Sequence, residues 1–373
     1  MKPTAPVIGS LEYATLLVGS VLASTLFVWP LHIVMVAGEN ATISMLMAGA
    51  FSMLFILLQV IAWTPNESAP LMEWVLTATG VILTLVVDAL VLVLFIDMLK
   101  EFFFPETPRV ALVAPLALLT GWWATASWKR IARRAQFWVP LMLVGSLVPI
   151  FLSFFDWAHP VALAPHSWTA FVPEMQGVAI LAYVVVPLGA TARVAARRLA
   201  GSARDRVRAG LGAIFGLWLW LALVFATTVG SLGTDALVHL SWPLVYVLEE
   251  ATLDSSFVVS RPGVLTIFGW SALIVIALVV HLRLAITVAE DLNAGGRSIG
   301  LVAIGIGEAA YWAGVVLLDT AHQASALLIS EVDPVAAGLI ILEVLVAATV
   351  VGLRTFRRRS RRTSPSQPVP DDP

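Results

Sequence analysis

The sequence predicts an all-α integral membrane protein with ten transmembrane helices. Hydrophobic residues make up 59% of the chain and charged residues 12%, whereas a soluble domain carries about 25% charged residues. The chain contains ten apolar runs of about 20 residues, the length that crosses a hydrocarbon core of about 30 Å. It has no cysteine, which excludes disulfides, thiolate metal sites and cysteine nucleophiles.

The ten runs follow one another with short connections, so residues 1–356 are expected to form one membrane domain. The first run is longer than the core of a signal peptide, about 7 to 15 residues, and has no obvious cleavage site, so we expect it to be retained as a span. The predicted spans are 13–36, 41–63, 71–98, 109–128, 137–155, 167–192, 209–232, 262–284, 299–318 and 334–353.

The basic residues fall mainly on one side of this topology. With the N-terminus inside, 19 of the 22 Lys and Arg residues lie in cytoplasmic segments and three, Lys100, Arg109 and Arg261, lie outside. This distribution follows the positive-inside rule and requires an even number of spans. We therefore expect both termini in the cytoplasm. His281 and Arg283, near the inner end of the eighth span, are expected to extend to the lipid headgroups.

The tail, residues 357–373, reads RRRSRRTSPSQPVPDDP. It is basic and then rich in proline and polar residues, a composition that cannot bury a core and predicts disorder. Its arginines favour the cytoplasmic leaflet, so anchoring to the lipid bilayer is the simplest role, and a docking motif for a partner is the alternative. The net charge of −2 indicates no nucleic-acid partner.

Two spans carry breaks at corresponding positions, each being the first span of a five-span half. In VGSVLASTLFVWPLHIVMVAGEN small polar residues precede Pro30, and AFVPEMQGVAILAYVVVPLG has a polar first half. Paired broken helices point to a central binding site between inverted repeats, because their free amides and carbonyls can hold a zwitterion. Simple proline kinks are the alternative. The candidate ligand residues at the breaks are Ala23, Ser24, Thr25, Gln176 and Gly177.

Five segments, read in order, resemble one known family. They are ASTLFVWPLHIVMVAGEN, LKEFFFPETP, KRIARRAQFWVPL, PLGATAR and SWPLVYVLEE. Together they resemble the spore germination receptor B-subunit family, a permease-like branch of the amino acid, polyamine and organocation superfamily. The resemblance implies a LeuT-like 5+5 inverted repeat with broken first and sixth helices. It also implies location in the spore inner membrane, a small germinant that is commonly an amino acid, and A and C subunits as partners.

The chain departs from the family pattern at the expected ligand site. Ala23, Ser24, Thr25 and Leu26 stand where the family usually has G-[ST]-G-I, so the glycine freedom that lets backbone amides approach a carboxylate is reduced. Val178 follows Gly177 where a glutamate is expected, and the usual acidic neighbours are missing around Arg261, in the sequence SRPG. An unusual ligand, or a lost one, therefore remains open.

Ionisable residues at membrane depth are the other candidates, because a charge at the bilayer centre is unfavourable by about 2.5 to 3.5 kcal/mol and usually faces a cavity or a partner. Asp88 in the third span is assigned to a polar ligand cavity or proton-linked switch, with a neutral structural acid as the alternative. Asp97 and Arg261 are assigned to a gate or interface. For Glu308 and Glu343, structural pairing and contact with a partner subunit stay open beside a ligand role.

The sequence gives no support to an enzyme. It has no phosphate-binding GxxxxGK[ST], no HExxH and no histidines at metal-ligand spacing, so we expect no cofactor and no metal. Glu249, Glu250 and Asp254 are more typical of a solvated acidic face than of a catalytic carboxylate pair. Three functions remain: a receptor subunit that binds a germinant and signals, a secondary transporter of amino acids or amines, and a scaffold that has lost its ligand.

Overall fold

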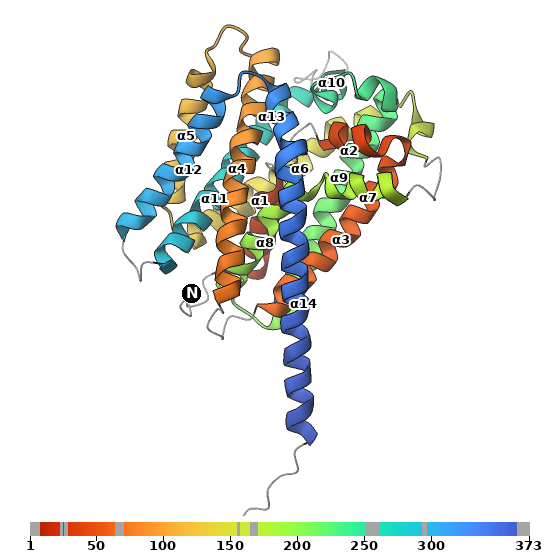
Figure 1. Cartoon of the computed structure of the whole chain (residues 1–373). Coiled ribbons are helices and arrows are strands. Elements are labelled where there is room, and N and C mark those ends of the chain that lie inside the picture. Colours follow the sequence, from red (N-terminus) through yellow and green to blue (C-terminus); the bar gives the residue numbers. More distant parts are fainter. Residues whose placement is uncertain are drawn as a thin grey trace, which may run out of the picture.

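The computed structural model describes residues 8–22, 25, 29–63, 71–154, 157–164, 171–250, 262–292 and 297–363, and every regular element among them is a helix (Figure 1). The helices are α1 (Ser10–Leu22), α2 (Trp29–Ala37), η1 (Gly38–Asn40), α3 (Ala41–Ala62), α4 (Leu71–Phe102), α5 (Arg109–Ala124), α6 (Trp128–Phe154), η2 (Pro160–Leu163), α7 (Phe171–Ala179), α8 (Ala182–Ala196), α9 (Ala203–Leu237), α10 (Pro243–Glu250), α11 (Pro262–Leu292), α12 (Arg297–Leu317), α13 (Ala321–Leu327), η3 (Leu328–Val332) and α14 (Asp333–Thr363).

Long apolar helices confirm a membrane protein with many spans. Within the described residues, seven helical stretches are long and apolar enough to cross a membrane, or eight when the bent pair α7 and α8 counts as one span. The count falls below ten because α1 and α5 are short, with 13 and 16 residues, and because α2, η1 and α3 form one helical stretch. Ten spans therefore stay a prediction.

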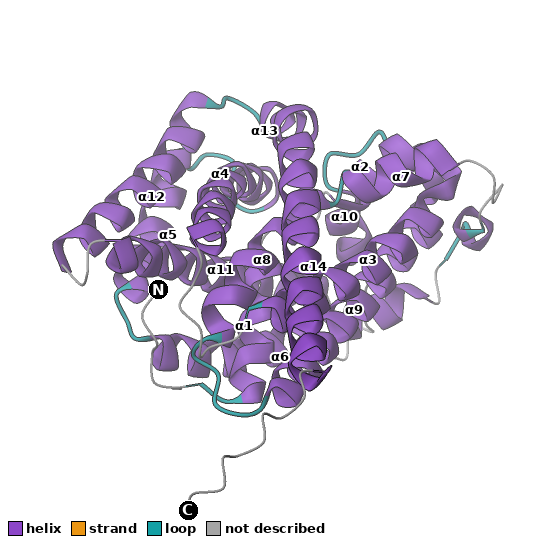
Figure 2. Ribbon diagram, turned by 60° about the horizontal axis from the view of Figure 1, so that its bottom comes forward, coloured by secondary structure: helices purple, strands orange, loops and turns teal. Residues whose placement is uncertain are grey.

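The helices form two groups with a layer between them. At the left of Figure 1, α4, α5, α11 and α12 pack on one another, and at the right α2, α3, α7 and α9 do so. Helices α1, α6 and α8 lie between the two groups. Figure 2 shows α14 running along the outside of this layer, and it packs on α8, α3 and α4.

The sixth span has the expected break. Helices α7 and α8 meet at 50° with only Ile180 and Leu181 between them. Pro187 lies inside α8, so the proline is not at the break itself. The first predicted span, 13–36, falls on two helices, α1 and α2, and residues 23–24 and 26–28 between them lie outside the described residues. Broken helices occur at membrane depth where they are buried in protein or line a cavity.

Helix α9 begins at a capping box that the sequence encodes directly. Ser202 Oγ accepts a hydrogen bond from the N–H of Asp205 at 3.3 Å, and the Ser202 N–H donates to Asp205 Oδ2 at 2.9 Å. This reciprocal pair satisfies two amides that the first turn of a helix leaves free. It fixes the start of α9 directly after the connection from α8.

The N-terminal end of the first span is tied to that same connection. The Ile8 N–H donates to the Arg198 carbonyl at 3.1 Å, and the Ala200 N–H donates to the Ile8 carbonyl at 2.9 Å. These two hydrogen bonds form a single parallel bridge between Ile8 and Leu199. The start of α1 and the connection from α8 to α9 therefore lie on one side of the molecule, where α14 also ends (Figure 1).

Helix α14 continues farther than expected from the sequence. The predicted span ends at residue 353 and the predicted disorder begins at 357, but the helix runs to Thr363. The first seven residues of the tail are therefore helical, which agrees with the good helix propensity of arginine. Residues 364–373 lie outside the described residues.

Candidate ligand site at the break of the sixth span

The break between α7 and α8 leaves the first amides of α8 without helical carbonyl partners, and a carboxylate from α14 takes one of them. Asp333 Oδ1 accepts a hydrogen bond from the Tyr183 N–H at 3.0 Å. Tyr183 is the second residue of α8 and Asp333 is the first residue of α14. The partial positive charge at a helix N-terminus favours an anion in this position. Asp333 thus caps a broken helix from another span.

The second oxygen of the same carboxylate is available. Asp333 is only 4% exposed, and its Oδ2 is buried and has no hydrogen-bond partner among the described residues. A buried unpaired carboxylate oxygen is unfavourable unless a donor reaches it. Asp333 Oδ2 is therefore a ready acceptor for a donor group of a ligand.

A chain of polar side chains begins at Tyr183, the residue whose N–H binds this carboxylate. The Tyr183 hydroxyl lies 3.3 Å from His32 Nδ1, and His32 Nε2 lies 2.7 Å from Ser325 Oγ. The aromatic rings of His32 and Tyr183 also meet edge to face, 5.9 Å apart. These contacts join α2, which falls in the second half of the first predicted span, to α8 and α13. We call His32, Tyr183, Ser325 and Asp333 the break site.

A small apolar cavity of about 180 Å³ lies against the break. It begins at Leu181 and Ala182 and extends along α14 to Ala337, one turn beyond Asp333 on the same face of the helix. The other residues that line it are Ala48, Phe51, Ser52, Met175, Val178, Ala179, Val185, Ile340 and Ile341. The Ser52 hydroxyl is bonded to the Ala48 carbonyl at 2.8 Å, so the surface of the cavity is hydrocarbon.

The structure describes three of the ligand residues predicted at the breaks: Thr25, Gln176 and Gly177. Gly177 faces α3 and α2, where an added Cβ would stand 2.5 Å from Ser44 Oγ and 2.9 Å from Ala37 Cβ. Its small size therefore allows α7 to approach these helices, while Gln176 is exposed. Thr25 is buried and its hydroxyl donates to the Leu22 carbonyl at 2.8 Å. The predicted positions Ala23 and Ser24 lie outside the described residues.

Asp88 belongs to a separate buried triad between α4, α11 and α12. Both of its carboxylate oxygens lie 2.9 Å from His281 Nδ1, and the Tyr311 hydroxyl donates to Oδ2 at 3.1 Å. The expectation that His281 extends to the headgroups is wrong, because the residue is 1% exposed and paired with Asp88. His281 Nε2 finds no partner among the described residues.

Two of the residues considered for a gate, interface or pairing role have structural partners: Asp97 near a helix end and Glu308 midway along α12. Arg109 pairs with Asp97 Oδ1 at 2.6 Å and donates to the Leu318 carbonyl at 2.7 Å, which links the ends of α4, α5 and α12. Glu308 accepts a hydrogen bond from the Thr120 hydroxyl at 3.2 Å, across α12 and α5. Arg261 lies outside the described residues.

Glu343 forms a buried ion pair with Arg193, which is the structural pairing that the sequence allowed. Arg193 donates to Glu343 Oε1 at 2.8 Å, to Gln59 Oε1 at 2.9 Å and to Thr77 Oγ1 at 3.0 Å. The side chains of Arg193 and Glu343 are 0% and 3% exposed. An arginine counted from the sequence among the cytoplasmic charges thus lies inside the protein. Arg197 and Glu73 form a second buried pair beside it.

Sequence reasoning missed the residues of the break site for identifiable reasons. Asp333 stands just before the predicted start of the tenth span, where it reads as a loop residue, although Asp-Pro is a typical start of a helix. His32 reads as one polar residue in an apolar run. A rule that treats every ionisable residue near membrane depth as functional would have found both.

Comparison with known proteins agrees with this architecture. The sequence model of a family described as "Spore germination protein" matches residues 8–293. No curated protein sequence matches the chain. A nucleobase-cation-symport-1 family transporter, Mhp1, in a closed conformation with bromovinylhydantoin bound, is 12% identical and aligns over 91% of this chain and 80% of its own with a TM-score of 0.51.

A second similar structure is the Eremococcus coleocola manganese transporter in complex with an aromatic bis-isothiourea substituted compound. It is 14% identical and aligns over 94% of this chain and 81% of its own, with a TM-score of 0.50. At these identities the likeness shows a shared fold, the LeuT-type transporter fold. Among the described residues, no group of three or more His, Cys, Asp or Glu side chains is placed to hold a metal ion.

Proposed function

Because the chain belongs to the spore germination protein family, we propose that this permease-like membrane protein is the germinant-binding subunit of a nutrient receptor. In this proposal a small amino acid binds between the broken first and sixth spans and shifts the protein between two conformations. The proposal includes a ten-span 5+5 repeat, cytoplasmic termini, the spore inner membrane, and A and C subunits as partners. The family and the distribution of basic residues support these points.

The observation that carries the proposal is the free oxygen of Asp333. The other oxygen of this carboxylate, Oδ1, accepts a hydrogen bond from the Tyr183 N–H, so the carboxylate is held in position before a ligand arrives. A carboxylate that is buried and half satisfied favours a cationic donor. The ammonium group of an amino acid is such a donor, and the hydroxyl and imidazole groups of Tyr183 and His32 lie on the same site.

The cavity beside the break suits a small apolar side chain. Its volume of about 180 Å³ is below the range of about 300 to 1,000 Å³ for pockets that hold drug-sized ligands. Its walls are hydrocarbon, so burial of an aliphatic side chain is favourable by about 25 cal/mol for each Å² removed from water. We therefore expect small aliphatic amino acids to bind better than charged or aromatic ones.

Signalling by this site follows from the helices that it joins. Its residues come from α2, α8, α13 and α14, so a ligand at this site lies beside elements that are far apart in the chain. A ligand shifts a conformational equilibrium when it binds one state better than the other. A ligand that satisfies Asp333 Oδ2 only when α8 and α14 are close favours that arrangement, and partner subunits then respond to it.

A secondary transporter is the second candidate, since the structures with the same fold are transporters. Fold alone does not decide between the two. Proteoliposomes that contain the purified chain separate them: uptake of labelled amino acids beyond one ligand per protein, lost when the vesicles are permeabilised, identifies a transporter. Saturable binding that survives permeabilisation without accumulation identifies a receptor subunit.

The site itself is tested with Asp333→Asn, which keeps the shape and the acceptor for the Tyr183 N–H but removes the charge. We expect binding of labelled alanine and valine to weaken by about 10- to 100-fold, since a hydrogen bond to a charged group contributes about 1.5 to 3 kcal/mol. The matched control is Glu331→Gln, which removes an exposed carboxylate two residues away. Equal affinity in Asp333→Asn and in the unchanged protein would reject the break site.

A further inference from the structure

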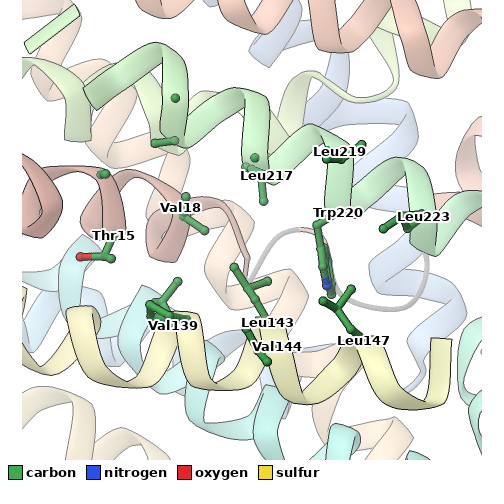
Figure 3. Close-up of a pocket in the computed structure, with 15 residues that line it drawn as sticks. Thr15, Val18, Val139, Leu143, Val144, Leu147, Leu217, Leu219, Trp220 and Leu223 are labelled. Atoms are coloured by element: carbon green, nitrogen blue, oxygen red, sulfur yellow. The ribbon is translucent and has the colours of Figure 1, made fainter. Parts of the chain in front are cut away.

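A second cavity lies between α1, α6 and α9, away from the break site. It has a volume of about 420 Å³. Figure 3 shows its walls, with Val18 from α1, Leu143 and Leu147 from α6, and Trp220 reaching from α9 towards α6. Two glycines of α9, Gly212 and Gly216, line this cavity. The space beside them is open, because a Cβ added at either position would meet nothing within 4 Å.

The surface of this groove is hydrocarbon. Thr15 lies in it, but its hydroxyl already donates to the carbonyls of Leu11 and Glu12, at 3.1 and 3.0 Å. Trp220 Nε1 donates to Ser146 Oγ at 2.9 Å. The groove opens sideways, since Val144 and Leu219 on its walls are 64% and 55% exposed. An occupant must therefore be apolar and enter from the surrounding lipid.

Two arginines stand at one end of the groove. Arg133 is seven residues before Pro140 on α6, and Arg208 is four residues before Gly212 on α9, so each lies on the same helix face as the groove-lining residues. Each is the sixth residue of its helix. Figure 3 shows the residue numbers of α6 and α9 rising in the same direction, which places both arginines beyond the same end.

The arginines are accessible at that end. The side chain of Arg133 is 66% exposed, and Arg208 is exposed. Glu12 of α1 faces Arg133, with Nε and Oε1 3.7 Å apart, and Asp205 lies near both Arg208 and the neighbouring Arg204, so acidic groups offset only part of the basic charge at this end. An apolar groove with a basic mouth matches an anionic phospholipid, whose acyl chain is hydrocarbon and whose phosphate attracts arginine.

We propose that the groove between α1, α6 and α9 binds an anionic phospholipid, with one acyl chain along Gly212 and Gly216 and the phosphate beside Arg133 and Arg208. The volume of the groove fits one acyl chain better than a helix of a partner protein. A single helical turn, about 10 Å wide and 5.4 Å long, already occupies about 420 Å³, whereas a spanning helix needs about 30 Å of length. The site is independent of the break site.

The test uses the full-length protein in a neutral detergent, with phosphatidylglycerol or phosphatidylcholine added and bound lipid counted by native mass spectrometry. We expect retention of phosphatidylglycerol over phosphatidylcholine. The double variant R133Q/R208Q is expected to weaken phosphatidylglycerol retention by about thirtyfold, because each basic residue near a lipid phosphate contributes about 1 kcal/mol. The control R130Q/R134Q removes the same charge, with Arg134 lying 4.4 Å over the Trp123 ring.

A second pair of variants tests the acyl-chain part. Gly216→Leu fills the groove and is expected to prevent lipid retention. Gly145→Leu adds the same side chain at an exposed α6 position outside the groove lining, also with open space around its Cβ. Thermal unfolding of each variant checks that it is folded. The proposal is overturned if the protein retains the two lipids equally or if the two arginine pairs have equal effects. Full competition by inorganic phosphate, or lipid retention in Gly216→Leu, would also overturn it.

Discussion

Replacing Arg193 with methionine is expected to destabilise the chain by about 3 to 5 kcal/mol, and replacing Glu343 with leucine as well is expected to recover most of that loss. The reason is the burial of the pair: the two side chains are 0% and 3% exposed, and 2.8 Å separates their nearest atoms. Without Arg193, the Glu343 carboxylate stays buried and loses its cation. Without both charges, the site keeps neutral polar groups such as Gln59 and Thr77 but no buried charge.

The structure shows how much depends on Arg193. Its guanidinium donates to Glu343, to Gln59 at 2.9 Å, to Thr77 at 3.0 Å and to the Leu76 carbonyl at 3.3 Å. The single variant leaves several of these acceptors with fewer donors, and each buried group left unsatisfied is unfavourable by about 1 to 3 kcal/mol. Gln59 still accepts from Trp63 Nε1 at 2.9 Å, which keeps the total near the middle of the range.

The measurement is thermal unfolding followed by the intrinsic fluorescence of the 14 tryptophans. For 373 residues, an unfolding entropy of about 2 cal/mol/K per residue converts 3 to 5 kcal/mol into a Tm lower by about 4 to 6 °C. Arg204→Met, at an exposed position of α9, serves as the control and should shift the Tm by less than about 1 °C. If the double variant is as unstable as Arg193→Met, the pair is not a desolvated ion pair and the reasoning fails.

Two further changes test other contacts. Asp88→Asn weakens the contacts to His281 and Tyr311, so we expect the free energy of unfolding to fall by about 1 to 3 kcal/mol. Tyr311→Phe removes one hydrogen bond and should lower the free energy of unfolding by about 1 kcal/mol. If both variants have the same Tm as the unchanged protein, the triad contributes nothing to stability. Gly177→Ala places a Cβ 2.5 Å from Ser44 Oγ and should lower the free energy of unfolding by about 1 to 3 kcal/mol. The control Gly338→Ala adds a Cβ in open space and should not lower it. Equal effects of these two variants would refute the packing role of Gly177.

The helical fold could be predicted because it follows from apolar run length. Each run of about 20 apolar residues needs a helix to satisfy its backbone in lipid, and long helices such as α4, α9 and α11 appear where the runs lie. The break of the sixth span was also predictable from its polar first half. The break occurs at Ile180 and Leu181, after Gly177, because the chain turns where Asp333 supplies a cap from outside the segment.

Partners across the fold could not be predicted. Asp333 and Tyr183 are 150 residues apart, as are Arg193 and Glu343, and His281 and Asp88 are 193 apart. Hydropathy assigns each residue to a depth but says nothing about which helix faces it. For this reason the sequence placed Arg193 among cytoplasmic charges and His281 at the headgroups, while both are buried with acidic partners.

The bridge at Ile8 joins two parts of the chain that are far apart in the sequence. Its two hydrogen bonds join the start of α1 to the connection between α8 and α9, so the first half of one broken span and the second half of the other share an anchor. A displacement of α1 away from the bundle would either break these two hydrogen bonds or displace the C-terminal end of α8 as well. Since Asp333 caps the opposite end of α8, this one helix connects the break site to the anchor that holds the start of α1.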